Sequence, residues 1–177
     1  MDEKMEGVVQ PGDNETIRAA FRDVMRQYAT SVSVVATLDE QGNPHGMAAS
    51  SVISVSMEPP SMLFAVNKAA SLHSILERAS HFVVNMLGSE QLDIVECFSR
   101  SELREQRFKV GNWGTGAFGL PFVTNGRAAI FCRLDRVVAY GTHSLHIGVV
   151  EHVIDGIAGA PLIWLDGSRA ELLLRAG

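Results

Sequence analysis

The sequence predicts a mainly β protein with flanking helices, in which one antiparallel β-barrel forms a single domain. Two observations support this fold class. Segments in which apolar and polar residues alternate recur along the chain, and short turns typical of hairpins separate them. Three segments with helical periodicity do not alternate regularly with these strands, as they would around a parallel sheet.

Length and composition limit the possible classes. The 177 residues are 46% hydrophobic, which is enough for one core, and we expect a flexible arm over residues 1–12 and one domain over residues 13–177. The net charge of -5 without a basic stripe argues against nucleic-acid binding. No apolar run reaches the ~20 residues of a membrane span, and the first residues are acidic, so we expect a cytoplasmic protein.

The first predicted element is an amphipathic helix. Asp13 or Asn14 can cap its first turn, and its apolar residues recur at steps of three and four. These residues are Ile17, Ala20, Phe21, Val24, Met25 and Tyr28. We expect this stripe to pack against the rest of the chain.

A hairpin follows this helix. Residues 31–38 and 45–57 alternate as strands, and residues 39–44 form the turn between them. In the second strand, one face carries Met47, Ile53 and Met57 and is expected to be core. The other face has almost only small side chains and hydroxyls, which suits a ligand site. Pro59 and Pro60 end the strand, because neither can donate to a ladder.

The remaining elements complete the barrel. Residues 62–67, 81–87, 126–140, 145–154 and 161–165 are predicted strands. A helix opened by residues 68–71 and capped by Ser71 extends to residue 79, and Ser89 can cap another through residue 98. Residues 101–108 form a charged helix or turn, and residues 109–122 an irregular loop.

Two clusters of polar residues fit an oxyanion, each with an ordinary structural alternative. Ser50 and Ser51 are either small residues where sheet segments pack closely or hydroxyl donors to an anion. Asn67, Lys68 and Ser71 lie where a strand gives way to a helix, and they are either capping residues or a second oxyanion contact.

The histidines and arginines leave further alternatives. His143 is predicted in a loop, where it is an ordinary surface residue or a ligand contact, and His146 should point to the opposite face, so no metal site is expected. Arg100, Arg104 and Arg107 form a solvated face or a clamp for a second phosphate. No nucleophile motif is present, so the residues alone predict a small barrel with a hydroxyl-lined cleft and name no reaction.

Five segments together resemble the flavin reductase family. In order, they are FRDVMRQYATSVSVVAT, GNPHGMAASSVISVSMEPPSMLFAVNKAAS, FVVNML, QRF and GTHSLHIGVV, within about residues 18–155. The sequence is similar to the reductase component of 4-hydroxyphenylacetate 3-monooxygenase. The resemblance implies an FMN-binding split barrel, usually a homodimer with its flavin sites near the subunit interface.

The resemblance also implies which residues bind the cofactors. His143 matches the histidine of a Gly-x-His motif near the nicotinamide, with Thr142 where many members have Asp, and Ala48 stands where Thr is frequent. No side chain is expected to be catalytic, because the flavin itself accepts hydride. The implied binding residues are Ser31, Val32, Ala48, Ala49, Ser50, Ser51, Asn67, Lys68, Ser71, Phe98 and His143.

The implied activity is hydride transfer from NADH or NADPH to FMN or FAD, which supplies reduced flavin to a partner monooxygenase. One alternative is a flavoprotein that retains its flavin and reduces another acceptor, such as a corrinoid or a ferric complex. The other is a non-catalytic barrel that binds flavin or haem.

Overall fold

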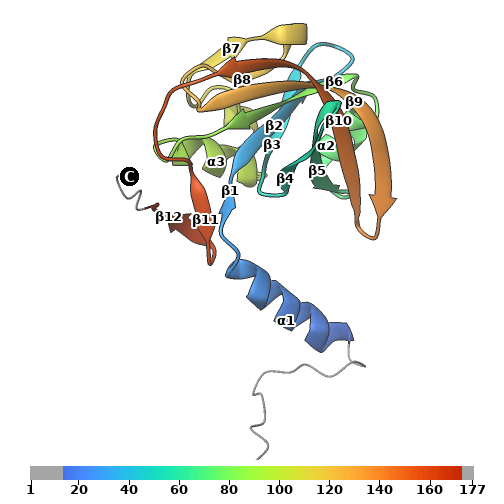
Figure 1. The fold of residues 1–177 in the computed structure, drawn as a ribbon, viewed down its shortest axis with the longest axis vertical. Helices are drawn as coiled ribbons and strands as arrows, with labels where there is room; N and C mark the ends of the chain where they lie inside the picture. The colour runs from blue at the N-terminus through green and yellow to red at the C-terminus, as the bar shows by residue number, and fades with distance from the viewer. Residues whose placement is uncertain (1–13, 173–177) are drawn as a thin grey trace, which may run out of the picture.

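A seven-stranded antiparallel sheet dominates the structure, a computed structural model that describes residues 14–172. The expected arm over residues 1–12 lies outside the described residues. The strand order is β3-β2-β6-β9-β10-β5-β4 (Figure 1). The strands are β2 (Ser33–Leu38), β3 (Pro44–Ala49), β4 (Val52–Met57), β5 (Pro60–Asn67), β6 (His81–Met86), β9 (Ala128–Tyr140) and β10 (His143–Asp155).

Smaller elements surround this sheet. The helices are α1 (Asn14–Arg26), α2 (Ser71–Leu76) and α3 (Leu92–Ser99), with short 3-10 turns η1 (Arg104–Gln106) and η2 (Ala117–Gly119). β1 (Thr30–Ser31), β11 (Ile163–Leu165) and β12 (Ser168–Ala170) form a second sheet, and β7 (Trp113–Thr115) pairs with β8 (Pro121–Val123). The mainly β, antiparallel fold class is therefore confirmed.

The sheet curls into a barrel at one short crossing. β3 and β4 are its two edge strands, yet only Ser50 and Ser51 separate them in sequence. Three residue steps span at most about 11 Å, so the two edges must approach each other here. The expectation of one continuous strand over residues 45–57 is wrong, because the chain leaves one sheet edge and joins the other at this point.

Aromatic and aliphatic side chains from the sheet and two helices form the core. Phe64, Phe82 and Phe131 are completely buried, and Phe64 meets Phe82 edge to face at 4.8 Å. Leu72 and Leu76 bring α2 onto this core, and α3 contributes a second buried cluster. Both α2 and α3 are thus packed onto the sheet through their buried side chains.

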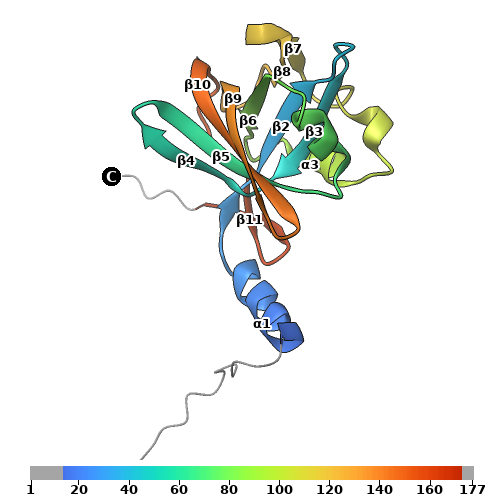
Figure 2. The same cartoon turned by 90° about the vertical axis from the view of Figure 1, so that its right-hand side faces the viewer.

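The expectation that the α1 stripe packs against this chain is wrong. No residue of α1 is buried, and Phe21 and Val24 are 66% and 62% exposed. In both views α1 extends away from the barrel (Figures 1 and 2). The contact of α1 with the rest of the chain is at the end of the helix. There Arg26 pairs at 3.0 Å with Asp166, which lies in the turn between β11 and β12.

Other predictions need smaller corrections. In β4, Ile53, Val55 and Met57 are more than half exposed, so this face is not core within the chain. α2 has Ala70 and not Ser71 at its N-cap, and α3 begins at Leu92, three residues after the predicted cap Ser89. Residues 109–122 contain most of the β7–β8 pair and η2 instead of only irregular loop.

Candidate functional site

The ends of β5 and β10 bring three of the predicted site residues together. Asn67, the last residue of β5, lies opposite His143, the first residue of β10. The Lys68 amide donates to the Thr142 carbonyl at 2.9 Å, and Lys68 Nζ donates to the Gly141 carbonyl at 2.8 Å. The end of β5 and the turn between β9 and β10 therefore form one polar edge.

Ser71 extends this edge into the start of α2. The Asn67 side chain accepts a hydrogen bond from the Ala69 amide at 2.9 Å, which holds the turn before the helix. Ser71 Oγ accepts a hydrogen bond from Arg104 Nη2 at 3.0 Å. Because the Ser71 oxygen is the acceptor, its hydroxyl hydrogen is free to donate to an anion.

The Ser50–Ser51 crossing lies beside the same edge, and its two hydroxyls differ. Ser51 Oγ donates to the Ala65 carbonyl and accepts from the Ala65 amide, both at 3.2 Å. Ala65 is two residues before Asn67 on β5. Ser50 is exposed, and its hydroxyl makes no hydrogen bond within residues 14–172. Of the predicted pair, Ser50 is thus the one available to a ligand.

Four predicted residues flank this crossing. Ala49 lies opposite Ser33 and Ala48 opposite Val34, so β2 and β3 run side by side up to the crossing. Val32 and Ala49 are buried, whereas Ala48 is half-buried and Ser31 is exposed. Of these four residues, Ser31 and Ala48 are therefore the ones with exposed or half-buried surface near Ser50.

The structure does not bring Phe98 to this surface. Its side chain is only 2% exposed and packs against Phe108 and Trp113, with ring centroids 5.0 and 5.5 Å away. Gly46 covers it so closely that an added Cβ there would lie 2.8 Å from the Phe98 ring. Within this chain, Phe98 belongs to the core beneath the site.

A hollow of about 450 Å³, the cationic pocket, begins at Ser71. Residues 44–46, 71 and 72 line it, together with the η1 segment, which we define as residues 104–109, that is, η1 and the three residues after it. This segment contributes Arg104, Glu105, Arg107, Phe108 and Lys109. Lys109 was not among the site residues predicted from the sequence, although the basic residues Arg104, Arg107 and Lys109 recur closely there.

Arg107 has a structural role in this pocket. Its guanidinium donates to the carbonyls of Gly46, Cys97, Phe98 and Arg100 at 3.0–3.3 Å and lies 5.6 Å from the Phe98 ring centroid. Burial lowers its pKa, and the charge of Arg104 acts in the same direction. The alternative of a solvated face is therefore wrong for Arg107, which joins η1 to α3 and β3, and the alternative of a phosphate clamp stays a prediction.

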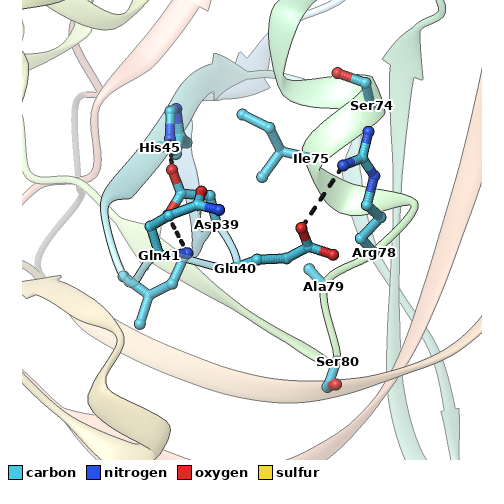
Figure 3. A pocket seen from close by; sticks show the side chains of 10 residues that line it. Asp39, Glu40, Gln41, His45, Ser74, Ile75, Arg78, Ala79 and Ser80 are labelled. Carbon is cyan, nitrogen blue, oxygen red and sulfur yellow. Dashed lines mark hydrogen bonds and ion pairs between the residues drawn. The ribbon is translucent and has the colours of Figure 1, made fainter.

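A second hollow of about 430 Å³ lies between the β2–β3 turn and α2 (Figure 3). Asp39 points toward His45 there, and Glu40 meets Arg78 at 3.8 Å. The Asn43 side chain is the main group that lowers the pKa of Asp39 to about 2, and His45 and nearby amides also contribute. Asp39 thus serves its own turn, and none of the predicted flavin contacts lines this hollow.

His143 and His146 point to opposite faces of β10, as predicted. His143 is exposed, and its Nδ1 lies 2.9 Å from Thr142 Oγ1. His146 is completely buried and stacks on Phe64. Within residues 14–172, no group of three or more His, Cys, Asp or Glu side chains has the arrangement of a metal site.

The donor set at this edge fits a flavin phosphate and ribityl chain. Ser50, Ser71, Asn67 and Lys68 are all exposed and offer hydroxyl, amide and ammonium groups. Within the described part of the chain, no helix is long and apolar enough to cross a membrane.

Comparisons with known proteins identify the family of this chain. Residues 25–173 match the family described as "Flavin reductase like domain". The chain is 37% identical over 139 residues to the reductase component of an FADH(2)-dependent resorcinol hydroxylase from Rhizobium sp. (strain MTP-10005). The aligned region covers 77% of this chain and 76% of that protein. It is 32% identical over 163 residues to an NADH:riboflavin 5'-phosphate oxidoreductase from Streptomyces pristinaespiralis, with 90% and 91% covered.

Solved structures show the same fold. The Streptomyces globisporus C-1027 NADH:FAD oxidoreductase SgcE6, solved in complex with NAD and FAD fragments, superposes with a TM-score of 0.85. That match has 26% identity and covers 96% of this chain and all of the other. The split-barrel architecture expected from the sequence is therefore confirmed.

Proposed function

Because this chain belongs to the flavin reductase-like family, we propose that it is an NADH-dependent flavin reductase that supplies reduced flavin to a partner monooxygenase. Two relatives support this proposal by their names, one as an NADH oxidoreductase of a flavin and one as the reductase component of a hydroxylase. The single observation in the structure that supports it is that Asn67 lies opposite His143 at the ends of β5 and β10, while Ser51 of the neighbouring crossing bonds to Ala65 on the same strand β5.

In this proposal each residue at the edge has a binding role. The hydroxyls of Ser50 and Ser71 donate to the ribityl chain and phosphate, and Asn67 and Lys68 complete the anion contacts. Ser31, Val32, Ala48 and Ala49 form a wall along the flavin ring, Ser51 holds the crossing in place, and Phe98 supports the site from the core.

His143 has the complementary role of orienting the nicotinamide. Flavin supplies the redox chemistry, since it accepts a hydride without help from an acidic or basic side chain. The protein has to hold the nicotinamide within ~3–3.5 Å of the ring and exclude water from that contact. His143 is exposed at the β9–β10 turn next to Asn67, where it can contact a nicotinamide lying over the site.

If the chain supplies reduced flavin to an oxygenase, its affinity for flavin has an upper limit. A flavin that must leave for an oxygenase has to bind no tighter than about micromolar, which corresponds to about 8 kcal/mol. FMN and FAD both fit the donor set of the edge. NADH is proposed over NADPH because the names of the relatives specify NADH.

Anaerobic stopped-flow mixing tests the proposal directly. We expect NADH to reduce added FMN or FAD in the presence of the protein, seen as loss of the oxidised-flavin absorbance, and NADPH to act more slowly. Ser50→Leu should lower flavin affinity at least tenfold, whereas Ser54→Leu, the same change at an exposed position of β4, should leave it unchanged. Absence of hydride transfer from either nucleotide would contradict the proposed activity.

We also propose that two copies of the chain form a homodimer through the arm made by β4, β5, β9 and β10. Met57 on β4 and Tyr140 on β9 are 81% and 79% exposed, and Ile53, Val55 and Val138 add further exposed apolar area on the same strands. Sedimentation should give a dimer that Val55→Asp with Tyr140→Asp converts to monomer. Ile157→Asp, an exposed change outside these strands, is the control.

A further inference from the structure

The cationic pocket continues from the proposed flavin site. Ser71 belongs to both, because it follows Asn67 and Lys68 along the chain and also lines the pocket. The volume of about 450 Å³ lies within the ~300–1,000 Å³ usual for small-molecule sites. A ligand whose phosphate reaches Ser71 therefore has an adjoining space to enter.

The charges that line this space are mostly positive and mostly unpaired. Three of its side chains are cations, and Glu105 is the one carboxylate. The Arg104 guanidinium bonds only to the neutral Ser71 hydroxyl, and the Lys109 ammonium makes no hydrogen bond or ion pair within residues 14–172. Both guanidinium and ammonium groups form strong hydrogen bonds with phosphate oxygens.

The segment that carries these charges is held rigidly. Arg107 fixes it through four carbonyls, as described above, and Phe108 anchors it in the core between Phe98 and Trp113. Phe108 adopts a φ of 63°, a left-handed conformation that is strained for a bulky residue and persists only where the surroundings impose it. The backbone that carries Arg104 and Lys109 is therefore ordered before a ligand binds, so that only the two side chains have to be ordered on binding.

The lining of the pocket also suits a nucleoside. Leu72 is buried beneath it, and Pro44 and Phe108 add apolar surface. An inorganic anion needs only the cations, whereas an adenosine also needs apolar contact for its base. Because Ser71 joins the pocket to the proposed flavin site, a dinucleotide can occupy both.

We propose that the cationic pocket binds the adenosine diphosphate half of a dinucleotide substrate, FAD or NADH, with Arg104 and Lys109 neutralising its phosphates. This inference rests on the proposed function, because it extends the ligand of that site beyond Ser71. It assigns Arg104 and Lys109 as specificity-determining residues: a ligand without this half, such as riboflavin, gains nothing from them.

ADP is the direct probe of this pocket. Calorimetric titration of the full chain with ADP should give saturable binding, and the double variant Arg104→Gln with Lys109→Gln should weaken it at least tenfold. The matched control is Arg78→Gln with Arg100→Gln, which removes two exposed cations that do not line the pocket. All these side chains are exposed, so the variants should keep the wild-type circular dichroism spectrum and melting temperature.

Binding of FAD and riboflavin and the KM for NADH then identify the source of the adenosine diphosphate. If FAD affinity falls about tenfold in the pocket variant while riboflavin affinity changes less than twofold, the pocket serves FAD. If the KM for NADH rises instead and FAD affinity is unchanged, it serves NADH. The proposal is overturned if ADP does not bind the wild-type chain, or if the control variant weakens ADP binding as much.

These results also separate the pocket from the proposed function. Wild-type protein that reduces FMN with NADH but does not bind ADP would retain the function and lose the pocket. Protein that binds ADP through Arg104 and Lys109 but reduces no flavin would retain the pocket as a nucleotide site and overturn the proposed function.

Discussion

Ser51 and Ala65 are joined by a reciprocal pair of hydrogen bonds, in which one hydroxyl serves both the amide and the carbonyl of the facing residue. This pair attaches the start of β4 to β5 at the point where the chain crosses between the two edges of the sheet. The neighbouring Ser50 makes no comparable contact within the described residues. Two adjacent serines thus have different tasks, one structural and one available to a ligand.

Alanine substitutions should separate these tasks. Ser51→Ala removes both hydrogen bonds and should lower the free energy of unfolding by about 1 kcal/mol, measured by urea titration. Ser50→Ala should leave stability unchanged and weaken flavin binding several-fold. Equal effects of the two substitutions on stability would show that the crossing does not depend on Ser51.

Arg107 should be the most sensitive of the arginines in its segment. Arg107→Gln leaves up to three partly buried carbonyls and one exposed carbonyl without their donor, and we expect a loss of about 2–3 kcal/mol of unfolding free energy. Arg100→Gln is the control, because only the backbone carbonyl of Arg100 takes part in these contacts. A loss below about 0.5 kcal/mol for Arg107→Gln would contradict the structural role.

His146 should make the protein less stable in mild acid. Burial lowers its pKa in the folded state, with His73 acting in the same direction and the Ser144 backbone and Glu77 opposing. The unfolded chain then binds the proton more readily, so stability falls as the pH drops below the unfolded pKa of about 6.5, by up to about 1.4 kcal/mol per pH unit. Neither ring nitrogen has a hydrogen-bond partner within residues 14–172.

Unfolding measured from pH 7.5 to 5 checks this origin. His146→Leu keeps an apolar group in the space on Phe64 and should flatten the dependence over this range. His152→Leu changes an exposed histidine of the same strand and should leave the dependence as in the wild type. An unchanged slope in His146→Leu would assign the acid sensitivity to another group.

The sequence could predict the strands and their antiparallel character because period-two patterns act locally. It could not predict what covers an apolar face. The stripe of α1 and the apolar side of β4 have the same pattern as core elements, yet Phe21 and Met57 are largely exposed in the single chain. A periodic apolar pattern predicts that a face is covered, but it does not indicate whether the same chain or another one covers that face.

For the candidate site too, the sequence could predict some residues and not their contacts. Motif resemblance predicted Asn67, Lys68 and His143 as site residues, and the pairing of β5 with β10 brings them together. It also suggested Phe98, which packs in the core, and it gave no reason to distinguish Ser50 from Ser51. The burial of Phe98 and the difference between the two serines depend on contacts between residues far apart in sequence. One such contact is that of Gly46 with the Phe98 ring.

His143 provides the sharpest test of the nicotinamide side of the site. It is exposed beside Asn67, and the Lys68 contacts with Gly141 and Thr142 hold its turn independently of its ring. His143→Ala should therefore keep flavin affinity within twofold of the wild type. It should also change the free energy of unfolding by less than about 0.5 kcal/mol. The KM for NADH should rise about tenfold, since one orienting contact is worth roughly 1.4 kcal/mol.

Steady-state kinetics at saturating flavin measure this effect, and two further variants make it specific. His143→Asn, which retains a hydrogen-bonding side chain, should recover part of the NADH affinity. His152→Ala, an exposed histidine farther along β10, should behave as the wild type. If His143→Ala instead weakens flavin binding and leaves the KM for NADH unchanged, His143 contacts the flavin, and the nicotinamide must approach from a different part of the edge.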